Sequence, residues 1–349
     1  MGTHITRRTL LHGCASAAAL IATPGILRAQ ARYRPEYKLS CVGNRPLGTT
    51  EAAYRWAELV AAQTQGRINI KIYPGSQLVG GDQTRELVAM RQGLIDMLVS
   101  STINIALQIR EMNLFSLPFL MPDSAAFDAL VTGAVRSDLD AALAKQGGVA
   151  LAWSENGFRQ ISNSKRSVRK PEDLVGLKIR FAAGPIFSEI FNKLGANPLQ
   201  MSWADLQPAL ATGAVDGQET PVNVFLQTRL DALSQRYLSL WNYVADANVC
   251  HVSKPVWDTF TADDQAIMRS AAEQAAREHT ASTRKGLGGN GDRSSLDELA
   301  RRNVHVEELS EAEKRAFGEV TKPVFEKWAG QTGTELVEKA SKAIARRNA

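Results

Sequence analysis

The chain has 349 residues, of which 44% are hydrophobic and 22% charged, so it can bury a substantial core, and this composition argues against a wholly disordered chain. This length favours two domains. The formal net charge is +5, but three arginines near the N-terminus, with no acid among them, supply three of these charges and leave +2 for the rest. The low net charge of the rest of the chain argues against nucleic acid as a partner, and so does the lack of a run of basic residues interleaved with aromatic ones.

The first 31 residues have the features of an export signal. The pair Arg7-Arg8 precedes a small apolar stretch, Cys14 to Ile21, and small residues around Ala31 offer a cleavage site. The arginine pair resembles the twin-arginine signal, and an ordinary secretory signal is the alternative. The apolar stretch is shorter than the roughly 20 residues that span a bilayer. We therefore expect a soluble, periplasmic protein.

The region after the signal alternates strands and helices, as α/β proteins do. Strands are predicted at 37–42, 68–73 and 95–99, and helices at 50–64 and from Gly80-Gly81-Asp82 to about residue 93. Such an order favours a mostly parallel sheet. The pattern restarts after Gly147-Gly148, which predicts a second α/β unit.

The second unit also alternates predicted strands and helices. It has predicted strands at 149–154, 158–162, 177–182 and 248–253, a helical turn at 171–174, and helices at 185–194, 203–211 and 261–285. A basic, Ala-rich helix ends the chain.

Several kinds of site chemistry find no support. Only Cys41 and Cys250 follow the signal, each in an apolar run, so two buried free thiols are favoured over a single disulfide. The five histidines have no metal-ligand spacing. The segment from Gly286 to Gly291 fits G-x-G-x-x-G, but it follows a long helix and is interpreted as a helix end and loop. We expect no metal, no cofactor and no catalytic group.

The most specific motifs lie between Asn156 and Pro221. They are NGFRQISN at 156–163, PEDLVGLKIR at 171–180, LGANP at 194–198 and ALATGAVDGQETP at 209–221, after IYPGSQL at 72–78, GLIDM at 93–97 and LPFL at 117–120. In combination they resemble the DctP-type substrate-binding proteins of tripartite ATP-independent periplasmic (TRAP) transporters. The resemblance runs from about Tyr37 to the C-terminus.

This resemblance implies an α/β, two-lobed periplasmic binding protein fold with a hinge and a long helix, 261–285, spanning both lobes. Lobe I would hold 32–155 and 247–286, and lobe II 156–246 and 287–349. The implied function is capture of a small organic acid and its delivery to TRAP membrane subunits, and we expect a monomer. Two alternatives are a periplasmic α/β enzyme acting on a small carboxylic acid and a protein that presents its ligand to a sensor kinase.

Arg180 is the leading candidate for a ligand contact. It lies mid-strand between Ile179 and Phe181, whose side chains point to the opposite face, and a guanidinium in a sheet interior needs an anion. In the family that the chain resembles, an arginine at this position pairs with the ligand carboxylate and one at the position of Arg159 assists. The alternative for Arg180 is an internal salt bridge, with Glu155 or Asp216 as partner; Arg159 could likewise be structural.

The remaining candidates are Trp203, Thr220, Asn44, Arg45, Ser101 and Thr102. Trp203 either stacks on the ligand or belongs to the core. The residues at 44–45 and 100–102 follow strands, where α/β sheets present ligand groups, although turn chemistry alone also explains them. Thr220 stands where the family commonly has Asn, so an assignment such as sialic acid does not carry over.

Overall fold

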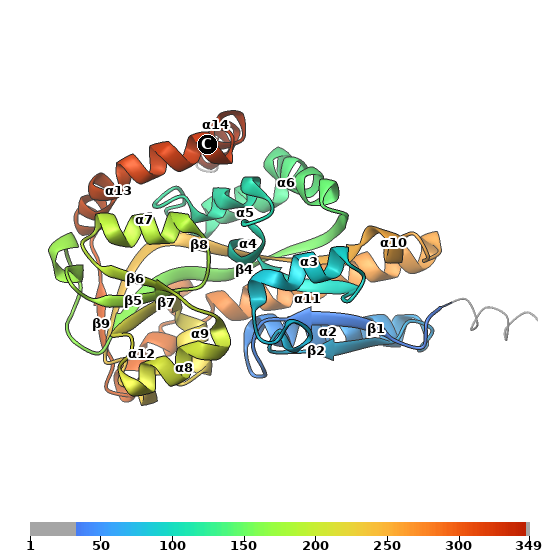
Figure 1. Ribbon diagram of the computed structural model, residues 1–349, viewed down its shortest axis with the longest axis horizontal. Helices are drawn as coiled ribbons and strands as arrows, with labels where there is room; N and C mark the ends of the chain where they lie inside the picture. The colour runs from blue at the N-terminus through green and yellow to red at the C-terminus, as the bar shows by residue number, and fades with distance from the viewer. Residues whose placement is uncertain (1–32, 347–349) are drawn as a thin grey trace, which may run out of the picture.

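The computed structural model describes residues 33–346, and one sheet of nine strands organises these residues (Figure 1). The predicted export signal lies outside the described residues. In spatial order the strands are β2 (Ile70–Tyr73), β1 (Tyr37–Cys41), β3 (Met97–Ser101), β8 (Tyr237–Ser253), β4 (Gly148–Asn163), β7 (Gly217–Pro221), β5 (Lys178–Phe181) and β6 (Asn197–Gln200), with β9 (His305–Glu308) beside β8. The outer strands on each side pair in parallel, whereas β8 and β4 run antiparallel in the middle.

Helices cover both faces of this sheet. They are α2 (Gly48–Gln63), α3 (Glu86–Arg91), α4 (Thr102–Ile105), α5 (Ser124–Thr132), α6 (Ala134–Lys145), α7 (Pro185–Lys193), α8 (Trp203–Thr212), α9 (Val222–Gln227), α10 (Lys254–Trp257), α11 (Ala262–Arg284), α12 (Ser294–Arg301), α13 (Glu311–Thr332) and α14 (Thr334–Arg346). Within residues 33–346, none of them is both long and apolar enough to cross a membrane.

Two strands differ from the sequence prediction. The segments 149–154 and 158–162 form one strand, β4, because Gly157, at a φ of +121°, absorbs a register shift against β8 without ending the strand. β8 begins at Tyr237, eleven residues before the predicted start at Asn248, since polar residues such as Asp246 interrupt its apolar pattern. Both strands are therefore long enough to run through the whole molecule.

β4 and β8 join two halves of the molecule. Their pairing extends from Gly148 opposite Ser253 to Asn163 opposite Tyr237. One end of the pair carries β3, β1 and β2, and the other carries β7, β5 and β6. The exact lobe boundaries stay a prediction; α13 packs on α7, whereas α14 packs on α5 and α6, within the range expected for lobe I.

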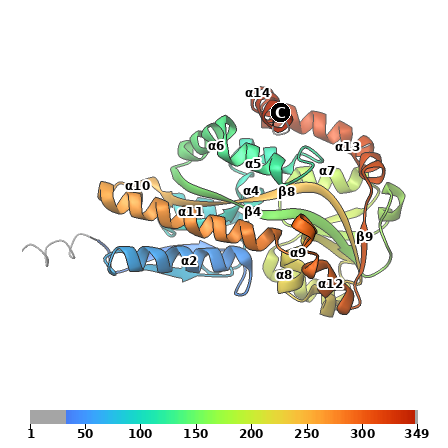
Figure 2. The same cartoon turned by 180° about the vertical axis from the view of Figure 1, so that it is seen from behind.

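The long helix α11 matches the one predicted at 261–285 and contacts both halves (Figure 2). The Thr261 hydroxyl caps its first turn by accepting a hydrogen bond from the backbone N–H of Asp264, 3.2 Å away. Alanines that recur every three to four residues form the buried face of α11, and their small side chains let α2 approach closely. The indole N–H of Trp56 in α2 donates a hydrogen bond to the Met268 carbonyl of α11. Near its other end, the Thr283 hydroxyl accepts from the Asn223 amide of α9.

The apolar core has three parts. The largest cluster extends behind both halves, under α5, α6, α7, α13 and α14, which lie together along one side of the molecule (Figure 1). The opposite face carries two separate clusters, one under α2 and α11 and one under α8, α9 and α12. The core is therefore continuous on one face and divided on the other.

Both cysteines are buried and free, as predicted. Cys41 on β1 and Cys250 on β8 each lie opposite Val99 of β3, so a strand separates them. Burial raises the pKa of each thiol to about 12, which keeps both in the unreactive neutral form.

Candidate functional site

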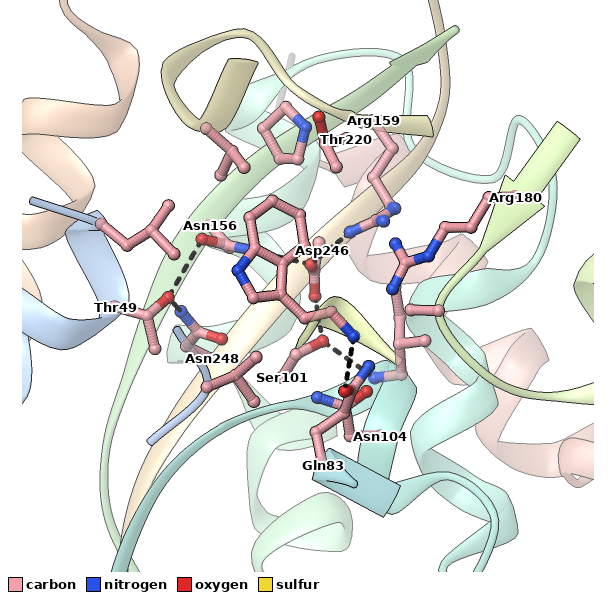
Figure 3. Close-up of a pocket in the computed structure, with 17 residues that line it drawn as sticks. Thr49, Gln83, Ser101, Asn104, Asn156, Arg159, Arg180, Thr220, Asp246 and Asn248 are labelled. Atoms are coloured by element: carbon pink, nitrogen blue, oxygen red, sulfur yellow. Dashed lines mark hydrogen bonds and ion pairs between the residues drawn. The ribbon is translucent and has the colours of Figure 1, made fainter. Parts of the chain in front are cut away.

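A cavity of about 70 Å³ lies where the two halves meet on the divided face (Figure 3). Its walls come from the loop after β1, the β3–α4 junction, the middle of β4 and β8, β5, and the start of α8 and α9. Hydrogen bonds cross between the halves beside the cavity: the backbone N–H of Trp203 donates to Gln83, and the backbone N–H of Gly48 donates to Gln227. The halves are therefore closed on the cavity.

Arg180 enters the cavity from β5 and is 1% exposed. Its Nε and Nη2 donate to the carbonyl of Met201 at 3.0 and 2.8 Å, which leaves the edge formed by Nη1 and Nη2 toward the cavity (Figure 3). Within the described part of the chain it forms no ion pair, and burial lowers the pKa of its guanidinium to about 10. The salt-bridge alternative fails for both proposed partners, because Glu155 pairs with Arg284 and Asp216 with Lys165.

Arg159, two strands away on β4, in contrast has carboxylate partners for its guanidinium. Its guanidinium donates to both carboxylate oxygens of Glu219 and, through Nη1, to Asp246 at 2.8 Å. Burial opposes its charge, but Glu219 and Asp246 outweigh burial and raise the pKa of Arg159. The Tyr243 hydroxyl donates to Glu219 at 2.8 Å and completes the network.

Asp246 on β8 holds the network at the cavity wall. Besides the bond from Arg159, it accepts from the Ser101 hydroxyl at 2.6 Å and from the Asn156 amide at 2.9 Å. Burial raises the pKa of this carboxyl, while Arg159 acts in the opposite direction. Asp246 lies opposite Gly157, at the register shift between β4 and β8, so the strand irregularity and the ion network coincide.

Three other lining residues keep polar atoms without a partner in the described structure. These atoms are the side-chain oxygens of Asn104, Thr220 and Asn248. Among residues 33–346, the buried amide oxygen of Asn104 has no hydrogen-bond donor beside it. Apolar side chains, Ile103 and Pro221 among them, form other parts of the wall. A small ligand with an acidic group and further oxygens would satisfy these atoms.

The predicted site residues divide into two groups. Arg180, Arg159, Trp203, Thr220 and Ser101 line the cavity, and the ring of Trp203 lies 5.9 Å from the Arg180 guanidinium carbon.

The others lie elsewhere. Thr102 is buried at the start of α4 without reaching the cavity, and Asn44 faces a separate hollow beside Gly75. Arg45 is half-exposed because it donates two hydrogen bonds to Glu51 of α2, at 2.7 and 2.6 Å.

The sequence prediction missed the amides and the carboxylate that line the cavity: Gln83, Asn104, Asn156, Asp246 and Asn248. A usable signal existed for two of them, since Asp246 and Asn248 interrupt the apolar run from Val244 to Val249. A polar side chain in a buried strand needs a partner, and here the partners surround a cavity. Within the described residues, no group of His, Cys, Asp and Glu could hold a metal ion.

Comparison with known proteins gives a consistent result. The profile of the DctP family, described as bacterial extracellular solute-binding protein family 7, matches residues 46–331. A crystal structure of a TRAP periplasmic solute-binding protein from Ralstonia eutropha, with bound (S)-2-acetolactate, is 51% identical, covers 90% of this chain and 100% of that chain, and superposes with a TM-score of 0.88. The expected two-lobed α/β binding-protein fold is thereby confirmed.

Two relatives carry different ligands in their names. The 2,3-diketo-L-gulonate-binding periplasmic protein YiaO of Escherichia coli is 34% identical over 64% of this chain and 67% of its own length. The C4-dicarboxylate-binding periplasmic protein DctP of Rhodobacter capsulatus is 29% identical over 84% of this chain and 86% of its own.

Proposed function

Because this chain belongs to the DctP family of bacterial extracellular solute-binding proteins, we propose that it binds a short hydroxy or oxo acid in the periplasm through Arg180 and passes it to the membrane subunits of a TRAP transporter. Family membership itself makes the chain a periplasmic binding protein for small organic acids and removes the enzyme alternative. The identity of the acid, the residues that hold it and the membrane partner are the parts proposed.

The observation that carries the proposal is the state of Arg180. A buried guanidinium without a carboxylate is unfavourable, and this one is held by a neutral carbonyl along one edge only. Its second edge has the two parallel N–H donors that grip a carboxylate. The ligand carboxylate would supply the missing counter-charge, and Trp203 would cover it.

The lining of the cavity supports a short acid. Apolar residues such as Leu47, Val224 and Pro221 favour a compact, branched ligand over a sugar acid that carries a hydroxyl on nearly every carbon. The oxygens and amide of Asn104, Thr220 and Asn248 suit one or two hydroxyl or oxo groups beside the carboxylate. Bound (S)-2-acetolactate in the Ralstonia eutropha protein is a ligand of this kind.

A thermal-shift screen followed by calorimetric titration tests this proposal. The panel contains short branched hydroxy and oxo acids, sugar acids such as galactonate, and the corresponding neutral esters. A short acid at a hundred times its Kd stabilises the folded protein by about 2.7 kcal/mol, so its melting temperature should rise by several degrees. The esters serve as the matched control and should leave the melting temperature unchanged. Equal shifts with acids and esters would exclude Arg180 as the carboxylate partner.

Delivery to a transporter requires its own experiment. Reconstituted TRAP membrane subunits from the same organism should accumulate the identified acid only when this protein is added with it. Uptake that is independent of the protein would contradict the proposed partner.

A further inference from the structure

The charges around the cavity are few and can be counted. Arg159, Arg180 and Asp246 line the cavity, and Glu219 lies behind Arg159. All four side chains are at most 6% exposed, so water screens them little. No lysine, histidine or further arginine lines the cavity within residues 33–346. Two cations and two anions give the ligand-free site no net charge.

The two cations are not equivalent for an incoming anion. Arg159 uses Nε, Nη1 and Nη2 on Glu219 and Asp246, so two carboxylates already more than match its charge. Arg180 donates only to a carbonyl, which carries no net charge. The site therefore holds one uncommitted positive charge, enough for one carboxylate.

Asp246 determines what the rest of the ligand can be. Three donors, from Ser101, Asn156 and Arg159, fix this carboxylate at the wall, so it cannot turn away from a ligand. A second ligand carboxylate would lie in the cavity beside a like charge, with only amides and hydroxyls as other partners. A hydroxyl in the same place could instead donate to Asp246.

We propose that Asp246 makes this pocket selective for monocarboxylates and excludes dicarboxylates, including the C4 dicarboxylates that some relatives are named for. This inference rests on the proposed function, because it takes Arg180 as the partner of the single carboxylate. The substrate class is a short monocarboxylic acid whose other oxygens are uncharged. Like-charge juxtaposition at a desolvated site is a common means of rejecting a wrong partner.

Calorimetric titration of the wild-type protein near neutral pH, with succinate and its monomethyl ester, tests the inference without a mutation. The ester has one negative charge and is the larger molecule, yet it should bind at least about tenfold more tightly than succinate. Equal affinities, or tighter binding of succinate, would overturn the selectivity while leaving the carboxylate-binding function intact. Failure of the wild-type protein to bind any monocarboxylate would remove the proposed function and this inference together.

The variant Asp246→Asn tests the residue itself. It keeps the size of the side chain and removes its charge, so the preference for the ester over succinate should fall by about tenfold or more. The matched control is Asp231→Asn, which removes a buried carboxylate paired with Arg229 and Arg302, outside the cavity. The control should keep the wild-type preference. A folded Asp246→Asn protein with that preference unchanged would show that another feature excludes the second carboxylate.

Discussion

The two arginines of the site should respond in opposite ways to the same substitution. Arg180→Met keeps a side chain of similar length and removes the charge. Burial lowers the pKa of Arg180 from 12.5 to about 10, and each pKa unit corresponds to about 1.4 kcal/mol. The charged form of this arginine is therefore less favourable in the ligand-free folded protein than in the unfolded chain by about 3 kcal/mol.

Removing the charge in Arg180→Met relieves this penalty and should raise the free energy of unfolding, but the substitution also has a cost that offsets part of this gain. The Met201 carbonyl loses its two hydrogen bonds from Arg180, and a buried acceptor without a partner costs about 1–3 kcal/mol. The free energy of unfolding of the ligand-free Arg180→Met protein should therefore be unchanged or higher by up to about 2 kcal/mol. Ligand affinity should fall by at least about a hundredfold, because two charge-assisted hydrogen bonds to the carboxylate are lost.

Arg159→Met is the matched control. It leaves the carboxylates of Glu219 and Asp246 buried without their cation, which should lower the free energy of unfolding by about 3–5 kcal/mol. Urea unfolding of both ligand-free variants, with calorimetric titration of the ligand, separates the two roles. If Arg180→Met were destabilised as much as Arg159→Met, or still bound the ligand normally, the assignment of Arg180 to the ligand would be wrong.

Three further outcomes are expected. Asn104→Leu should leave the folded state as stable as before, because the amide oxygen has no partner within the described residues. Calorimetric titration should show that the variant binds a hydroxy or oxo acid about tenfold more weakly. Unaltered affinity would contradict a contact between Asn104 and the ligand. Burial lowers the pKa of His251 to about 3, below the ordinary 6.5. Between these two pH values only the unfolded chain takes up the proton on this histidine. The free energy of unfolding should therefore fall as the pH decreases through this range, by up to about 1.4 kcal/mol per pH unit. His251→Gln should show a shallower dependence in urea titrations from about pH 6 to about pH 4, and equal slopes would exclude this source, since every other titrating group is shared. The ligand-free protein in solution should open between the halves and give a larger radius of gyration in X-ray scattering than the ligand complex; identical values would indicate a rigid cleft.

The sequence was sufficient where a local pattern carried the information. The apolar period of α2 and α11 and the short apolar strands β1, β2 and β3 were predicted close to their observed bounds. β4 and β8 were not, because a strand that passes a bulge and a buried ion network no longer alternates in a simple way. Their polar residues suggested strand ends, although the strands continue through them.

The site shows the same division. Arg180 and Arg159 were identifiable as charges inside strands within a family motif. Asn104 was not, because α4 becomes part of the cavity wall only when it comes together with β8, which lies far away in the chain. Arg45 was expected in the site from its loop, but Glu51 binds its side chain at the surface, and a loop position does not reveal such a competing partner.

The uneven core has a consequence for how the molecule loses its structure. The apolar cluster behind the sheet contains buried side chains from both halves, so each half depends on residues of the other to complete its hydrophobic core. Melting one half would expose part of the interior of the other, and the two should therefore denature together. Calorimetry of the ligand-free protein should record a single cooperative transition, whereas two structurally independent domains would melt in separate steps. A mutation on either side of this shared layer should then reduce the stability of the entire molecule.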